Sequence, residues 1–351
     1  MESYSQRIDW ADYAKAIAIW LMVVCHFGLR PWELSRWIYI FHMPAFFFVS
    51  GYLDKGAPLT SALFKKYFRQ ILVPYFFFSV CALSACWIAP YYHPELFGGG
   101  SVADSFVRSV VGILLMDNTM RSYSFMPEGA LWFLVALFEV KIVFALMCLC
   151  WEKCKVLVPV ILLGLLVVFR LHIPFFTLDS AAMAVPIYAA GYFFRQFNLI
   201  ERVKGLWACM VVALVLWLYM VFVAPLNGNV SMNMAFTGRN AEMFYVNGII
   251  GSLALIFTCR IPRKPIAVLS TVRMCTLTIL ATHSYVIRFA KLIAVYGLGT
   301  ASGSMPMWFI VVFSFVALAC GVWIHKFLER HVAWSVGRGK VVGMRAVITH
   351  L

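Results

Sequence analysis

Long, mostly apolar runs separated by short polar stretches follow one another along the whole 351-residue chain. A helix needs about 20 residues to cross the hydrocarbon core of a bilayer, and most of the runs have this length. The pattern therefore predicts an all-α, polytopic membrane protein with about ten transmembrane helices. The expected spans are 10–29, 34–53, 69–90, 131–150, 155–171, 178–197, 206–225, 242–260, 270–296 and 304–326.

Two stretches fit this pattern less simply. The ninth expected span, 270–296, is long and polar in places. Between the third and fourth spans, Val102 to Met116 is amphipathic, and we expect it to lie in the plane of the membrane interface. No internal repeat is visible, which argues against transporter folds that are built by duplication.

The composition agrees with lipid as the main solvent of this chain. Hydrophobic residues make up 63% of it and charged residues only 13%, whereas soluble domains are about half apolar and about a quarter charged. A soluble chain of this size cannot bury so much apolar surface. We therefore expect a single transmembrane domain over 1–351, with a basic cytoplasmic tail at 330–351 and no separate soluble domain.

The cysteines and the net charge do not indicate another kind of site. Nearly all of the 10 cysteines fall inside apolar runs, where they are typical of small buried hydrophobes rather than of a disulfide framework. Their spacing fits no zinc motif, so we expect no metal. The net charge is +14, but the basic residues are scattered between apolar runs, which does not favour nucleic-acid binding.

The positions of these basic residues predict an orientation in the membrane. Most of the 29 Lys and Arg residues fall in alternate polar segments, beginning with the segment that contains Arg7. Cytoplasmic loops of membrane proteins carry such an excess of positive charge. The distribution therefore predicts that both termini of the chain are cytoplasmic.

The first expected span carries three ionisable side chains, Asp12, Lys15 and His26. Ionisable groups inside a span are costly and are candidates for function. Eleven positions separate Lys15 from His26, which places both on one helix face, roughly 16 Å apart along the axis. Asp12 lies one turn from Lys15 on the same face. The helix thus presents a polar stripe, with a cation near the cytoplasm and an imidazole near the outer leaflet.

These residue types suit a transfer reaction. An imidazole titrates near neutral pH, so His26 is suited to deprotonate a hydroxyl nucleophile or to attack a thioester itself, and the sequence leaves both routes open. Lys15 offers a fixed positive charge for an anionic donor or for an oxyanion. The alternative is that Lys15 only extends to the inner surface and that His26 only ends the helix.

Other polar residues inside the spans are candidates for lining a cavity. His42 precedes Pro44, and a proline inside a span frees backbone groups that need other partners. A packed helix is the alternative for His42, and an interfacial position is the alternative for Trp132. Glu139 and Lys141 lie on different faces of one helix, so we do not expect them to pair. The cavity candidates are Asp12, His42, Ser50, Tyr75, Trp132, Glu139 and His283.

A basic segment precedes the third expected span. Arg69 lies at the mouth of this span, and guanidinium geometry suits the binding of a diphosphate. Lys65 and Lys66 lie just before it. Positive charge on a cytoplasmic loop also follows from topology alone, so both explanations remain open at this point.

Several motifs together carry a family resemblance. Lys15 and His26 are separated by ten residues, and the stretch from Phe41 to Gly51 reads FHMPAFFFVSG. Further matching stretches are Arg69-x-x-x-x-Pro74-Tyr75, Leu131-Trp132-Phe133-Leu134 and Pro186 to Tyr192. Taken together, the chain resembles the membrane enzymes of acyltransferase family 3, whose signature is a basic residue, ten others and a histidine. Lysine stands here where arginine is more common. The FHMP stretch resembles the branch described as fucose 4-O-acetylase-like.

The resemblance implies a ten-helix membrane fold that transfers an acyl group from cytosolic acyl-CoA to a hydroxyl, usually on a sugar. It implies that His26 is the catalytic imidazole, that Lys15 places the donor or stabilises charge, and that Arg69 contacts a CoA phosphate. We therefore expect an O-acetyltransferase of the bacterial cytoplasmic (inner) membrane. Its co-substrate would be acetyl-CoA, and its acceptor a surface glycan or the lipid-linked precursor. A transporter or flippase for glycolipids or small solutes is the alternative hypothesis, and a membrane scaffold or sensor is a third hypothesis.

Overall fold

The computed structural model describes residues 8–28, 32–92, 102–116, 129–154, 158, 161–162, 164, 176–262, 266–299 and 305–338. The described residues form helices and connecting loops, with one isolated antiparallel bridge between Ser231 and Phe236. Most of the predicted span 155–171 lies outside the described residues. The helices are α1 (Asp9–His26), α2 (Trp32–Tyr39), α3 (His42–Tyr52), α4 (Ser61–Tyr67), α5 (Val73–Tyr92), α6 (Val102–Leu115), α7 (Trp132–Lys153), α9 (Leu178–Gln196), α10 (Leu206–Phe222), α11 (Ala241–Cys259), α12 (Ala267–Met274), α13 (Thr276–Leu292) and α14 (Met307–His331).

An all-α, polytopic membrane fold is confirmed. Among the described residues, 6 helical segments are long and apolar enough to cross a membrane. The helix α1 is not one of them, because its 18 residues include the charged side chains of Asp9, Asp12 and Lys15. The six segments are Ser61–Ser84, Gly129–Lys153, Leu206–Asn227, Ala241–Cys259, Thr276–Gly297 and Met307–His331.

The expectation of one continuous helix over 34–53 was wrong. The helix α2 ends at Tyr39 and α3 begins at His42. Pro44 explains the break, because its ring would clash with the carbonyl four residues earlier, whereas a proline in the first turn of a helix lacks only an amide that has no intrahelical partner. The Nδ1 atom of His42 lies 2.9 Å from the carbonyl oxygen of Ile38 and satisfies this group at the end of α2.

Two other expected spans differ from the structure at their ends. The span 270–296 is interrupted at Cys275, which separates α12 from α13, and a π-helical turn, Ile293–Gly297, extends α13. The span 69–90 begins earlier than expected, since α4, a π-helical turn at Phe68–Leu72 and α5 follow one another without a gap from Ser61.

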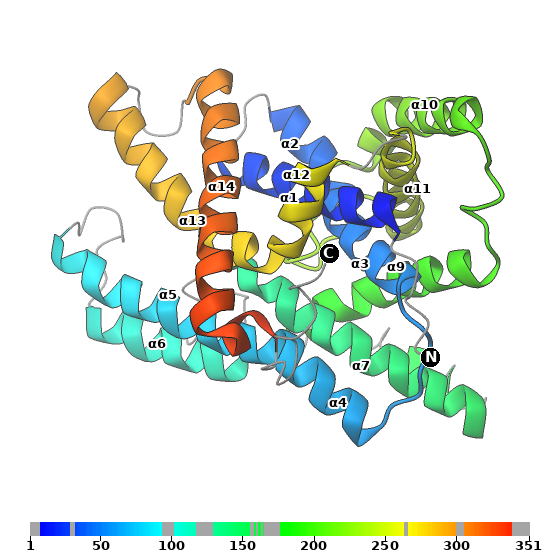
Figure 1. Cartoon of the computed structure of the whole chain (residues 1–351), viewed down its shortest axis with the longest axis horizontal. Coiled ribbons are helices and arrows are strands. Elements are labelled where there is room, and N and C mark those ends of the chain that lie inside the picture. The colour runs from blue at the N-terminus through cyan, green and yellow to red at the C-terminus, as the bar shows by residue number, and fades with distance from the viewer. Residues whose placement is uncertain are drawn as a thin grey trace, which may run out of the picture.

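The helix α1 lies in the middle of the molecule, with α2, α3, α11, α12, α13 and α14 around it (Figure 1). The helices α3 and α9 pack closely against each other, because Gly51 and Gly191 stand at their crossing. A Cβ atom at Gly51 would lie 1.9 Å from the carbonyl oxygen of Tyr188, and one at Gly191 would lie 2.0 Å from that of Phe48. Small residues at such crossings are typical of membrane helices.

The amphipathic segment expected at Val102 to Met116 is a helix, α6, that packs along α5 (Figure 1). The hydroxyl of Tyr75 on α5 donates a hydrogen bond of 3.1 Å to the carbonyl of Ile113 on α6. Tyr75 is fully buried in this contact, so it holds α5 and α6 together.

Candidate active site

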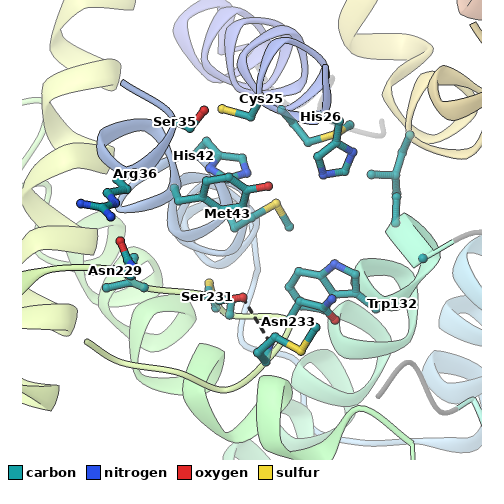
Figure 2. Close-up of a pocket in the computed structure, with 18 residues that line it drawn as sticks. Cys25, His26, Ser35, Arg36, His42, Met43, Trp132, Asn229, Ser231 and Asn233 are labelled. Carbon is teal, nitrogen blue, oxygen red and sulfur yellow. Dashed lines mark hydrogen bonds between the residues drawn. The ribbon is translucent and has the colours of Figure 1, made fainter. Parts of the chain in front are cut away.

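A cavity of about 690 Å³ lies at the C-terminal end of α1, between α2, α3, the start of α7 and the loop that joins α10 to α11 (Figure 2). This volume is within the range of small-molecule sites, which are mostly apolar with a few placed polar groups. Of the residues predicted from sequence, His26, His42 and Trp132 line it. The other lining residues are Met22, Cys25, Ser35, Arg36, Tyr39, Met43, Gly129, Ala130, Asn229, Val230, Ser231, Met232, Asn233, Met234 and Leu280.

His26 and His283 form a hydrogen-bonded pair at this cavity. His26 is the last residue of α1 and its side chain is exposed to the cavity, whereas His283 is fully buried in α13. The Nδ1 atom of His26 lies 2.6 Å from Nε2 of His283. The Nδ1 atom of His283 lies 2.8 Å from the carbonyl oxygen of Leu280.

These contacts assign the tautomers of both rings, because a backbone carbonyl can only accept a hydrogen bond. The Nδ1–H group of His283 therefore donates to Leu280, which leaves Nε2 of His283 as an acceptor. His26 donates its own Nδ1–H to that acceptor. The Nε2 atom of His26 then carries a lone pair toward the cavity. In hydrolases and transferases, a histidine base that another residue holds in one orientation is the arrangement that activates a hydroxyl nucleophile.

His42 lies beside this pair and is also held in one tautomer. Its Nδ1–H group donates to the carbonyl of Ile38, so its Nε2 atom is an acceptor. The ring of Tyr39 packs edge-on against it, with the ring centroids 5.1 Å apart. The helix break at Pro44 thus places His42 in the wall of the cavity, where its ring also bonds a backbone carbonyl.

The loop between α10 and α11 closes one side of the cavity, and sequence reasoning missed its role. Its residues 229–234 contribute Asn229, Ser231 and Asn233 to the lining. The side chain of Asn227 clamps this loop, since it donates to the carbonyl of Thr237 at 2.8 Å and accepts from the amide of Asn240 at 2.8 Å. Loop residues carry no periodic signal, so only their position between two apolar runs marked them.

Lys15 does not line this cavity. It lies further along α1, partly buried, and close enough to Asp12, Arg273 and Lys141 for their charges to interact. Asp12 is paired with Arg273 of α12 at 3.0 Å, so this carboxylate holds α1 against α12 rather than lining the cavity. The ammonium of Lys15 has no hydrogen bond or ion pair to any residue that the structure describes.

A second ionic group lies next to Lys15. The ammonium of Lys141 is 3.6 Å from the carboxylate of Asp54 and donates a hydrogen bond of 3.0 Å to the hydroxyl of Tyr188. The hydroxyl of Tyr188 donates in turn to Asp54. The charge of Lys66 acts on Lys141, which places the basic α4 segment on the same side of the molecule. Lys65, Lys66 and Arg69 are exposed there.

Three cavity candidates have other surroundings. Glu139 accepts hydrogen bonds from the amide and the hydroxyl of Thr177, at 3.2 and 2.8 Å, and so caps the start of α9. As the sequence indicated, Glu139 does not pair with Lys141. Tyr75 joins α5 to α6 as described above. Ser50 is partly buried within α3 and does not line the cavity.

A comparison with protein families identifies the family. A family model described as an acyltransferase domain matches residues 8–326. The chain belongs to acyltransferase family 3. Neither the curated proteins nor the solved structures include a match to it. Membership favours acyl transfer over the transporter, flippase or scaffold alternatives, and the matched range contains every residue of the site. Within acyltransferase family 3, the fucose 4-O-acetylase-like branch stays a prediction.

Proposed function

We propose that this membrane acyltransferase moves an acetyl group from cytosolic acetyl-CoA to a sugar hydroxyl of a surface glycan or its lipid-linked precursor. The bacterial cytoplasmic membrane is its proposed location. The observation that carries the proposal is the His26–His283 pair, because it leaves one basic nitrogen facing a cavity that is large enough for a sugar.

In the proposed reaction, Nε2 of His26 removes the proton from the acceptor hydroxyl as its oxygen attacks the thioester carbonyl carbon. The tetrahedral intermediate then expels the CoA sulfur, the carbon–sulfur bond breaks and the oxygen ester remains. The leaving thiolate takes the proton back from the imidazolium of His26, so the site returns to its starting state. His283 holds the ring in the active tautomer throughout, because its Nε2 atom accepts the Nδ1–H group.

In the proposed reaction, Trp132 supplies a hydrogen-bond donor for the negative charge that develops on the thioester carbonyl oxygen. Its indole lies across the cavity from the imidazole of His26 (Figure 2). No residue in the described part of the chain accepts a hydrogen bond from its Nε1–H group, so that group is available to a ligand. Fixed donors aimed at a developing oxyanion are worth about 10²–10³ in rate.

The basic group around Lys15 suits the donor. CoA is polyanionic, and Lys15, Lys66, Lys141 and Arg273 gather positive charge on one side of the bundle. In the predicted orientation this side faces the cytoplasm, where acyl-CoA is made. Lys15 and the base His26 stand roughly 16 Å apart along α1. The extended pantetheine arm of CoA would cross this distance and bring its thioester to His26.

The proposed function is tested with the purified protein in proteoliposomes, supplied with radiolabelled acetyl-CoA and with glycan precursors from cells that lack the protein. Label is expected in the glycan fraction, and mass spectrometry should find an added acetyl group on glycans only when the protein is present. Movement of the glycolipid across the membrane without any acetylation would contradict the proposal and support a flippase.

His283 is expected to act on the reaction only through His26. Replacing it with leucine removes the acceptor for the Nδ1–H group and should lower kcat about 10- to 100-fold, the size of effect seen for residues that orient metal-binding histidines, with the KM for acetyl-CoA unchanged. His283→Gln keeps a side-chain oxygen that can accept this hydrogen bond and should restore part of the rate. Equal losses in both variants, or a change confined to KM, would show that His283 only packs the core.

A further inference from the structure

The cavity has a second end that the proposed reaction does not use. Figure 2 shows Arg36 and Asn229 at one end of the lining, His26 and Trp132 at the other, and His42 between them. A monosaccharide hydroxyl placed at His26 would therefore leave the rest of its molecule directed toward Arg36. The chemistry of this far end determines which acceptors fit.

The guanidinium of Arg36 is the charged group at this end. Arg36 is exposed on α2 and forms no hydrogen bond or ion pair with the residues that the structure describes. Other arginines of the bundle are engaged, since Arg273 pairs with Asp12 and Arg260 pairs with Glu201. Among the described residues that line the cavity, none is an aspartate or a glutamate. Within the described part of the chain, no carboxylate at the cavity balances this positive charge.

The neighbours of Arg36 on α2 fix its place. Trp37 donates from its indole to the carbonyl of Met220 at 2.7 Å and packs against Trp217, with ring centroids 5.3 Å apart. Ser35 is buried on the other side and lies within hydrogen-bonding reach of the thiol of Cys25. Because both neighbours are anchored, the short helix cannot turn, and Arg36 is held at the cavity.

Asn229 is held in the same way, by the loop that Asn227 clamps. Gly238 lies under this clamp with a φ of +85°, and a Cβ atom there would lie 2.5 Å from the carbonyl oxygen of Asn227. The loop is therefore closed on a conformation that only glycine permits at this position. Asn229 brings amide donors and an acceptor beside Arg36, a combination that suits an oxyacid bonded to a sugar.

We propose that Arg36 and Asn229 form a subsite for an anionic group of the acceptor, a phosphate or a carboxylate. The proposal rests on the proposed function in taking the cavity as the acceptor site. A guanidinium binds both kinds of oxyanion with two parallel hydrogen bonds. The acceptor is accordingly an acidic glycan, whose charge comes from the phosphates of a lipid-linked precursor or from an acidic sugar.

The first test measures acetyl transfer to three octyl glycosides of one sugar by the protein in lipid nanodiscs. The first glycoside is neutral, the second carries a carboxylate and the third carries a phosphate. The native protein should use an anionic glycoside at least about tenfold better in kcat/KM than the neutral one, since a charge-assisted bond is worth about this factor or more. Arg36→Gln should remove this preference through KM and leave the neutral glycoside within about twofold.

The second test measures binding of the same three glycosides by thermal shift in the absence of acetyl-CoA. It keeps the subsite testable even if acetyl transfer itself fails. The anionic glycosides should stabilise the native protein and the control variant Arg239→Gln. Arg239 is an exposed arginine on the loop that carries Asn229, and it does not line the cavity. They should not stabilise Arg36→Gln. If the carboxylate glycoside gives the larger thermal shift, the charge comes from an acidic sugar. If the phosphate glycoside does, it comes from the phosphates of a lipid-linked precursor.

The subsite is overturned if no anionic glycoside binds better than the neutral one. It is also overturned if Arg36→Gln and Arg239→Gln weaken anion binding equally, which would indicate only a general charge effect of the outer surface. Loss of neutral and anionic activity together in Arg36→Gln, with normal thermal stability, would likewise contradict an anion-specific role. Acetyl transfer without any anion preference would leave the proposed function standing and remove the subsite alone.

Discussion

His26→Ala is expected to abolish acetyl transfer, with kcat reduced at least about 10³-fold. The alanine variant lacks the only nitrogen in the His26–His283 pair that faces the cavity, so neither the proton of the hydroxyl nor that of the thiol has a carrier. General-base catalysis alone contributes about 10²–10⁴ to such rates. The measurement is the initial rate of labelled acetate transfer in proteoliposomes at saturating acetyl-CoA.

The control for this result is His331→Ala, which removes an exposed histidine at the end of α14, outside the cavity. This variant should retain the native rate, and both variants should insert and elute as the native protein does. A fully active His26→Ala protein would remove His26 from the reaction. Incubation with acetyl-CoA alone should leave no acetyl group on His26, and a trapped acetyl-imidazole would replace the base mechanism with a covalent one.

Lys15→Ala is expected to raise the KM for acetyl-CoA about 100-fold. Its ammonium forms no hydrogen bond or ion pair among the described residues, and the nearby positive charges of Arg273 and Lys141 add to its attraction for an anion. Loss of a hydrogen bond between two charged groups costs about 1.5–3 kcal/mol, and about 1.4 kcal/mol corresponds to a factor of ten. Steady-state kinetics over a range of acetyl-CoA concentrations give the change in KM.

A truncated donor separates the binding of phosphates from other roles of Lys15. Acetyl-pantetheine has the thioester but not the nucleotide phosphates, so Lys15→Ala and the native protein should use it equally. Lys15→Arg keeps the charge and should retain most of the activity with acetyl-CoA. If Lys15→Ala were as poor with acetyl-pantetheine as with acetyl-CoA, Lys15 would not act on the phosphates of the donor.

Some features of the fold and the site could be predicted from short stretches of the sequence. Pro44 signals the break between α2 and α3, because its ring excludes a helical carbonyl four residues before it. This signal was present in the sequence and outweighs the unbroken hydrophobicity of 34–53. The positions of Glu139 and Lys141 on one helix likewise argued against a pair, and the structure gives each another partner.

Other parts of the site depend on contacts that no local pattern encodes. His26 and His283 are 257 positions apart and meet only because α13 packs against α1. Glu139 is polar inside a span and resembled a cavity residue, but the start of α9 uses it as a cap. A polar side chain in a span needs a partner, and the sequence does not say whether that partner is a ligand or another helix.

The sequence by itself determined that this chain is an all-α membrane protein and that one helix carries Lys15 and His26 three turns apart. Hydrophobic length and helical period set these features, and both act between near neighbours in the chain. Only the tertiary structure decided that His283 orients His26, that Asp12 is taken by Arg273, and that Arg36 and a clamped loop complete the cavity. Such contacts follow from how helices pack, and packing joins residues whose sequence separation carries no information about their distance in space.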